Sequence, residues 1–406
     1  MNGETEICAK EYEESKDEEM EESAFAEEEE IEASKNIPFH FPKEYGTITE
    51  FYFMLAESIH YGFTPILKRA EDVDKMFRNL MKEKEKMSSS HPEYHQMKEE
   101  FENMKNFKML YELTIYDRDL IKSLNNFFKI QFSLIKKWGN VNLKQGKLQD
   151  DPPKKVLKFL PEHFLTDMTD FWQYLFKNKN DSLTYFVPDD AIMIFEMAII
   201  IINSPRSITN PYIAAKFIEV LAMIIFFEER VNWLTHFTES RLIVEHLMEA
   251  LVKFYIEIEF SGDSGSMYYE KFHYRLDCSS VFKRLWKLKV FKEKFLAMVG
   301  TEKMEKFVNC LLNDTNHCLE EGISKLSEIK AFEMKVGSGE LPSKEEIKNN
   351  SKNENICKAN IQLSNECIIM VKNISSWAKE SFDNEVFTTR MASSLNFVLN
   401  KIVGPH

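Results

Sequence analysis

Glycine and proline are scarce in this sequence, with 12 of each among 406 residues. Both residue types mark tight turns, so their scarcity argues against many short strands and favours long helices. The longest apolar run, residues 191–202, holds 12 residues and includes Glu196. A helix that crosses a membrane needs about 20 apolar residues, so we interpret this run as a buried helix and predict no membrane span.

The compact motifs that identify many enzyme classes are also missing from the sequence. It contains no GxSxG, no phosphate-binding glycine loop and no GxGxxG. Residues 261–266 (SGDSGS) resemble a serine-protease motif in their letters alone. No matching histidine and aspartate constellation accompanies them, so we interpret this segment as a loop between helices. Scattered carboxylates are interpreted as solvated helix faces.

The cysteines and histidines do not form a recognisable metal or thiol site. No two of the cysteines stand in a CxxC spacing, which favours free thiols in a reducing compartment. Cys310 and Cys318 lie about two helical turns apart, too far to share one ion without another segment. His91 and His95 have no evident third ligand, and Pro92 follows the first of them. We therefore predict no catalytic, cofactor-binding or metal-binding residue. The six cysteines are Cys8, Cys278, Cys310, Cys318, Cys357 and Cys367.

Negative charge is concentrated at the N-terminus. Residues 1–34 contain 15 acids and two bases, a net charge of −13, while the remaining 372 residues contain 51 acids and 50 bases. Like charges repel and few apolar side chains are present, so residues 1–36 are predicted to be a disordered acidic tail. The rest is nearly neutral, which predicts no nucleic-acid partner.

Local capping signals mark several helix starts. TITE at residues 47–50 and SKEE at residues 343–346 fit the capping-box pattern. Asp117 is a further candidate cap. Three prolines stand where a first helical turn is expected, and proline is tolerated there. These prolines are Pro161, Pro188 and Pro211.

The chain is accordingly predicted to be all-α, without a convincing strand. A helix from Thr47 is expected to end at Gly62. We predict further helices at residues 65–87, 92–116, 117–138, 161–177, 188–203, 211–227, 241–260, 278–286, 303–335, 343–381 and 385–403. Long helices with short breaks suit a stacked helical solenoid, although no fixed repeat is visible. An irregular, armadillo-like array fits this pattern, with an N-terminal helical region at residues 37–150 and a second region at residues 151–406.

One stretch, residues 251–275, combines an apolar helix, a Gly/Ser-rich break and an aromatic-basic cluster. With VFKRLW (281–286) it forms the third of five blocks, and these blocks, in the order in which they occur, resemble the core of the ubiquitin conjugation factor E4 family, the U-box ligases that extend ubiquitin chains. The other blocks are FLPEHF (159–164), NPYIAAKFIEVL (210–221), FVNCLLND (307–314) with LEEGISKLSEIK (319–330), and MASSLNFVLNKIVGP (391–405).

The resemblance implies armadillo-like helices, with residues 151–406 as part of the core, and no cofactor. It implies ubiquitin-chain elongation on ubiquitinated substrates for proteasomal degradation, including ER-associated degradation, in cytoplasm and nucleus. The implied partners are a ubiquitin-conjugating enzyme, ubiquitinated substrates and an AAA-class segregase ATPase. Rate enhancement would come from proximity and would need no catalytic side chain of the core.

Relatives continue beyond this core into a U-box, the module that activates the conjugating enzyme. We find no U-box in these residues, so we expect either a fragment or incomplete gene model, or a short paralogue. The alternative function is a non-catalytic helical adaptor or competitor of ubiquitin-system partners. A generic solenoid adaptor is a third interpretation. Within the blocks, Tyr274 and Arg275 are expected to pack at a helix junction, and Asn313 and Asp314 to cap or bridge helices.

Overall fold

The structure is a computed structural model of the chain. It describes residues 46–88, 92–138, 160–177, 186–205, 208–231, 233–258, 265–339, 341–378 and 385–403. The chain divides into two units, Met1–Glu57 and Ser58–His406. In the first unit, residues 46–57 are described, and they include all of helix α2 (Thr47–Ser58) except its last residue. The predicted acidic tail at residues 1–36 lies outside the described residues.

Every regular element in the described ranges is helical, which confirms the all-α prediction. The elements of the second unit are η1 (Ile59–Phe63), α3 (Thr64–Lys86), α4 (Tyr94–Ile115), α5 (Arg118–Trp138), α7 (His163–Lys177), α8 (Pro188–Ile202), α9 (Pro211–Val231), η3 (Leu234–Glu239), α10 (Arg241–Glu257), α11 (Gly265–Leu285), α12 (Lys289–Leu296), α13 (Glu302–Gly337), α14 (Lys344–Trp377) and α15 (Glu385–Val403).

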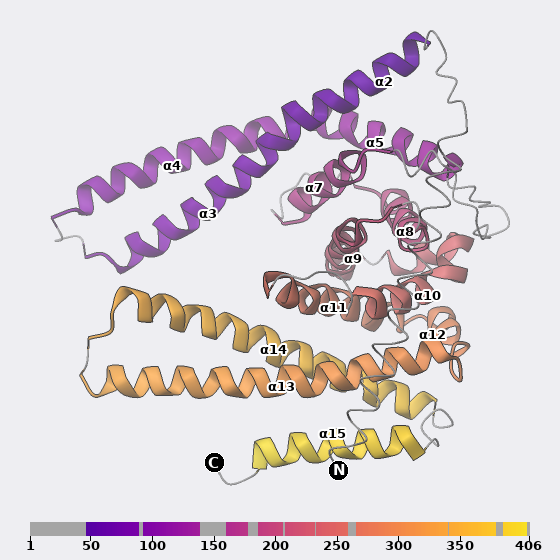
Figure 1. Cartoon of the computed structure of the whole chain (residues 1–406). Coiled ribbons are helices and arrows are strands. Elements are labelled where there is room, and N and C mark those ends of the chain that lie inside the picture. The colour runs from indigo at the N-terminus through magenta and orange to yellow at the C-terminus, as the bar shows by residue number, and fades with distance from the viewer. Residues whose placement is uncertain are drawn as a thin grey trace, which may run out of the picture. The chain divides into compact units, whose positions relative to one another are not determined.

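The helices pack in two adjacent rows that follow the chain. One row consists of α3, α7, α9, α11 and α14, and the other of α5, α8, α10 and α13. Contacts between α8 and α9 and between α10 and α11 join the rows. Two long antiparallel hairpins, α3–α4 and α13–α14, are visible in Figure 1. This packing confirms the solenoid-like fold, whereas the finer armadillo-like assignment stays a prediction.

Local capping chemistry explains several helix starts. The Ser343 hydroxyl accepts the Glu346 backbone N–H at 3.2 Å, and the Glu346 carboxylate accepts the Ser343 N–H at 2.8 Å. This confirms the predicted capping box. The Asp117 carboxylate accepts the Leu120 N–H at 2.8 Å, which confirms that cap too. Pro188 and Pro211 are the first residues of α8 and α9.

The prediction of a helix end at Gly62 is wrong. Gly62 lies inside the π-helical turn η1, and α3 begins two residues later, at Thr64. The Thr64 N–H donates to the Ile59 carbonyl, a bond that spans five residues. Pro65 follows directly and has no N–H to continue the regular bonding pattern. A wider turn at this point accommodates the proline and keeps the chain helical.

The predicted start of the helix at residues 278–286 is also wrong. Helix α11 begins at Gly265 rather than at Cys278, so Gly265 and Ser266 are helical and residues 261–264 lie outside the described residues. Tyr274 and Arg275 therefore lie within a helix. Two short elements, η3 and α12, had no predicted counterpart. Helix α12 has only eight residues, which is close to the lower limit for recognition from periodicity.

Helix α8 is almost entirely buried. Twelve of its 15 residues are buried, which confirms that the longest apolar run is a core helix. Its one acid in the middle, Glu196, accepts hydrogen bonds from the Lys136 amine at 3.0 Å and the Ser240 hydroxyl at 2.6 Å. These bonds offset the cost of burying a carboxylate. No described helix is both long enough and apolar enough to cross a membrane.

A buried ion pair joins four helices near the C-terminal end of both rows. The Arg275 side chain on α11 is fully buried, and its guanidinium donates to the Asp314 carboxylate on α13 at 2.6 Å. Two further N–H groups of Arg275 donate to the Tyr255 carbonyl on α10, at 3.1 and 3.2 Å. The Tyr255 hydroxyl donates to the other Asp314 oxygen at 2.8 Å and lies 3.5 Å from the Cys367 sulfur on α14. Asp314 therefore bridges helices, as predicted.

Replacement of Arg275 by leucine is expected to lower the free energy of unfolding by about 3–5 kcal/mol, because Asp314 would stay buried without its cation. Urea denaturation followed by circular dichroism measures this loss. Arg390→Leu is the matched control, since Arg390 is exposed and donates to Asn309 and Asn313 at the surface. That change should cost less than about 1 kcal/mol. Equal losses in the two variants would contradict the role assigned to the buried pair.

Close approach of α13 and α14 requires a glycine at residue 322. A Cβ atom at Gly322 would lie 2.9 Å from the Ile361 Cγ1 atom, and the Gly322 carbonyl accepts from the Cys357 thiol at 3.3 Å. Gly337, in the same helix, has no atom within 4 Å of an added Cβ. Gly322 and Gly337 therefore lie in the same helix but differ in the space that a side chain would have.

Gly322→Leu is expected to lower the free energy of unfolding by about 1–2 kcal/mol. Overpacking costs about 1–3 kcal/mol, and removal of a helical glycine recovers up to about 1 kcal/mol. Gly337→Leu should cause no loss, because its side chain enters open space. Thermal denaturation of both variants checks this difference, and Ile361→Ala should partly restore the Gly322→Leu variant. A Gly322→Leu protein as stable as the wild type would show that the helices can separate without cost.

Candidate functional site

A cavity of about 590 Å³ lies between helices α7, α9 and α11. Apolar side chains of α7 and α9 form much of its wall: Phe176, Met223, Ile225, Phe226 and Phe227. Phe226 is 57% exposed, so part of this apolar wall is open to solvent. Ligand-binding sites commonly combine an apolar wall with polar groups that orient the ligand.

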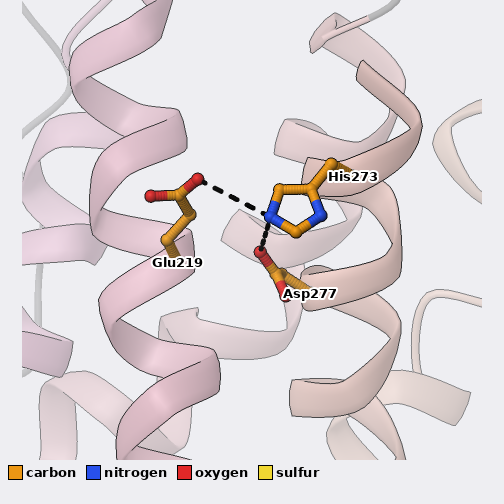
Figure 2. A group of neighbouring side chains, drawn as sticks. All are labelled: Glu219, His273 and Asp277. Atoms are coloured by element: carbon orange, nitrogen blue, oxygen red, sulfur yellow. Dashed lines mark ion pairs between the residues drawn. The ribbon is translucent and has the colours of Figure 1, made fainter. Parts of the chain in front are cut away.

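One group of polar side chains in the cavity consists of Glu219 from α9 and of His273 and Asp277 from α11 (Figure 2). His273 and Asp277 are four residues apart, so they project from the same face of α11. The His273 Nε2 atom lies 3.9 Å from a Glu219 oxygen and 3.7 Å from an Asp277 oxygen. His273 is 63% exposed at its side chain, whereas the two carboxylates are 20% and 21% exposed.

A buried glutamine orients the Glu219 carboxylate. The Gln173 side-chain amide on α7 donates to Glu219 Oε2 at 2.6 Å, and the other oxygen, Oε1, faces His273. Burial raises the pKa of Glu219 above its usual value, and His273 and Lys177 oppose the rise. Burial also raises the pKa of Asp277, to about 7, against the lowering effect of His273. Two carboxylates are thus held in a poorly solvated position around one imidazole.

Basic side chains line the cavity further along α11. Lys283 and Arg284 follow Asp277 by about two helical turns, and Lys287 lies two residues beyond the last residue of α11. Lys177 comes from α7. The Lys283 amine lies 2.6 Å from the Glu366 carboxylate on α14, so this lysine also joins two helices. The cavity therefore has a histidine-carboxylate group, a basic group and an apolar wall. This combination suits binding of a cation or of a polar ligand with an apolar part.

Sequence reasoning did not single out Glu219, His273 or Asp277. His273 lies in the stretch 251–275, but α11 was predicted to begin only at Cys278, which concealed the four-residue spacing of His273 and Asp277. Glu219 lies 54 residues before His273, and only the packing of α9 on α11 brings them together. The one signal in the sequence was the four-residue spacing of His273 and Asp277. This spacing indicates a shared helix face only if α11 is known to begin before His273.

The cysteines, histidines and asparagine that the sequence analysis considered individually lie outside the cavity wherever the structure describes them. Cys310 is half-buried and Cys318 is buried, both on α13. His95 is exposed on α4, while His91 lies outside the described residues. Asn313 accepts from Arg390 on α15, so it bridges helices as predicted. Cys318, Asn313 and the Arg275 and Asp314 pair belong to the packing of the helices. Neither these residues nor Cys310 and His95 line the cavity.

These features define a class of protein, a helical scaffold with a polar cavity between its stacked helices. The family described as ubiquitin elongating factor core matches residues 1–406, and the chain belongs to this family. This establishes the resemblance that the sequence blocks indicated.

Curated relatives carry related names. The chain is 26% identical over 386 residues to "Probable ubiquitin conjugation factor E4" of Arabidopsis thaliana, covering 89% of this chain and 36% of that protein. It is 26% identical over 402 residues to "Ubiquitin conjugation factor E4" of Schizosaccharomyces pombe, covering 88% and 38%. It is 25% identical over 269 residues to "E4 ubiquitin-protein ligase UFD2" of Saccharomyces cerevisiae, covering 61% and 27%. The chain thus spans little more than a third of the length of the first two relatives.

Four of the five thiols in the described residues are poorly suited to nucleophilic chemistry. Cys278, Cys318, Cys357 and Cys367 are buried. Burial raises the pKa of all four thiols, to about 12 for Cys318. The reactive species is the thiolate, and its fraction at neutral pH falls about tenfold for each unit by which the pKa rises.

In the native protein at neutral pH, iodoacetamide is therefore expected to modify these four cysteines at least about tenfold more slowly than Cys310, which is half-buried. In concentrated urea the difference should disappear, because every thiol becomes solvated. Mass spectrometry of peptides after timed labelling measures both rates. Rapid labelling of Cys278 or Cys367 in the native state would contradict their assigned burial.

Proposed function

We propose that this chain is the helical scaffold of an E4-type ubiquitin ligase, which extends ubiquitin chains on substrates that already carry ubiquitin. The observation that carries the proposal is the family match along residues 1–406, with relatives named as ubiquitin conjugation factors. One relative is named an E4 ubiquitin-protein ligase. In this proposal the extended chains direct substrates to the proteasome, including substrates of ER-associated degradation.

The proposed mechanism is positioning without a covalent intermediate on the scaffold. Ubiquitin transfer through a protein thioester needs an accessible thiolate, and the four buried cysteines have raised pKa values. The stacked helices would instead hold substrate-bound ubiquitin near a conjugating enzyme that carries the next ubiquitin. Well-oriented reactants react far faster than the same reactants free in solution, so a rigid holder can accelerate transfer.

The proposed partners follow from the same family membership. They are a ubiquitin-conjugating enzyme, ubiquitinated substrates and an AAA-class segregase ATPase, in the cytoplasm and the nucleus. In the proposed ligase, a U-box activates the conjugating enzyme. The near-zero net charge of residues 35–406, with 51 acids and 50 bases, favours protein partners over nucleic acid.

A second candidate function is a helical adaptor or competitor that binds ubiquitin-system partners without catalysis. The observation that favours it is the coverage: this chain corresponds to 36% and 38% of two relatives that are named as conjugation factors. A scaffold that binds the partners but does not activate a conjugating enzyme would reduce chain elongation by complete ligases.

A chain-elongation assay with activating enzyme, conjugating enzyme, ubiquitin and a ubiquitin-fused substrate tests both functions. The 406-residue chain alone is expected to give no elongation. A hybrid in which it replaces the matching segment of the fission yeast relative is expected to elongate chains. Gel electrophoresis of the substrate measures the products.

The control is the same hybrid without its U-box, which should be inactive. An inactive complete hybrid that still binds the ubiquitinated substrate, together with inhibition by the free chain, would favour the competitor. A folded hybrid that neither elongates nor binds would contradict both functions. Clear polyubiquitin products from the 406-residue chain alone would overturn the proposal of a purely positioning role.

A further inference from the structure

Three potential ligand atoms converge at one end of the cavity between α7, α9 and α11. They are a Glu219 oxygen, the His273 Nε2 atom and an Asp277 oxygen, all within 4.8 Å of one another (Figure 2). We propose that these three side chains bind a divalent first-row transition-metal ion, with Zn²⁺ as the representative ion. Neither the family match nor the names of the relatives includes a metal.

The distances are close to those that coordination requires. Zinc binds histidine nitrogen and carboxylate oxygen at about 2.0–2.2 Å, so its ligand atoms stand about 3–3.5 Å apart. The His273 nitrogen lies 3.7 Å from Asp277 and 3.9 Å from Glu219, beyond direct hydrogen-bond distance. Small rotations of the side chains bring the three atoms onto one ion. His273 has room for this rotation because 63% of its side chain is exposed.

The supporting residues resemble those of a metal site. Helix α11 supplies two ligands at positions four apart, which places both on one face, and α9 supplies the third. Gln173, itself buried, donates to the outer oxygen of Glu219 at 2.6 Å and so fixes the oxygen that faces His273. Hydrogen bonds of this kind to a ligating carboxylate orient it towards the ion.

The donor set favours one class of ion. Imidazole nitrogen suits zinc and its neighbours, whereas magnesium and calcium prefer oxygen ligands alone. Three protein ligands leave a fourth zinc position for water or another ligand, as at open zinc sites. Here the three ligands line the cavity, so that position would face its interior. The ion would also connect α9 to α11.

The test is calorimetric titration of the metal-stripped full chain with Zn²⁺, followed by Co²⁺ absorption spectra. We expect one strong site in the wild type. His273→Ala, Glu219→Gln and Asp277→Asn should each weaken binding by more than about 100-fold. Removal of a residue that binds the ion lowers metal affinity more than removal of a residue that only orients a ligand, which typically lowers it about 10–100-fold. Gln173→Ala should weaken it about 10–100-fold. The Co²⁺ spectrum should show nitrogen and oxygen ligands without thiolate.

His236→Ala is the matched control. His236 lies 2.8 Å from the Glu239 carboxylate on η3, and among the residues that the structure describes no third histidine, cysteine or carboxylate forms a possible metal-binding group with this pair. This variant should bind Zn²⁺ like the wild type. Zinc should raise the melting temperature of the wild type and of His236→Ala but not of His273→Ala, because binding stabilises only the folded form with an intact site.

Three outcomes would overturn the proposal. They are absence of stoichiometric Zn²⁺ binding in the wild type, binding of equal strength in the folded His273→Ala variant, and a thiolate Co²⁺ spectrum. Circular dichroism of each variant confirms that it is folded, and the two amide variants keep the shape of the carboxylates they replace. The outcome is independent of chain elongation, since metal affinity is measured without the ubiquitin system.

Discussion

The buried pair of Arg275 and Asp314 is the constraint on which the C-terminal part of the second unit depends. Taking two charges out of water is costly, and the cost is offset only when their hydrogen-bonding groups are satisfied. Arg275 meets this condition through Asp314 and the Tyr255 carbonyl, and Asp314 through Arg275 and the Tyr255 hydroxyl. Any shift of α10, α11 or α13 along its axis would break one of these bonds. The pair therefore sets the register of α10, α11 and α13 relative to one another. Apolar packing alone would specify this register less strictly.

Much of the fold was predictable because its signals are local. Pro188, Pro211, Asp117 and the Ser343 capping box act within one helical turn, and each stands at a helix start in the structure. The start of α11 was not predictable in this way. Its Gly/Ser-rich opening favours a loop, but Arg275 and the other buried residues of α11 gain partners from distant helices. Tertiary packing thus outweighs a weak helix propensity at Gly265.

The candidate site was less predictable than the fold for the same physical reason. Glu219 and His273 come from different helices, and their proximity depends on how α9 packs against α11. A lone glutamate on an apolar helix and a histidine among aromatic residues each have common structural explanations. Only their convergence, with Gln173 behind Glu219, distinguishes them from solvated surface residues.

Helix α11 connects the core to the cavity. His273 and Arg275 are two residues apart, which places them about 200° apart around the helix. One side of α11 therefore holds the buried ion pair, and another side lines the cavity with His273 and Asp277. A ligand or ion that joins α11 to α9 would favour the same helix position that Arg275 favours from the core. In a scaffold that acts by holding partners at fixed positions, occupancy of the cavity would add rigidity within the row that contains α7, α9 and α11.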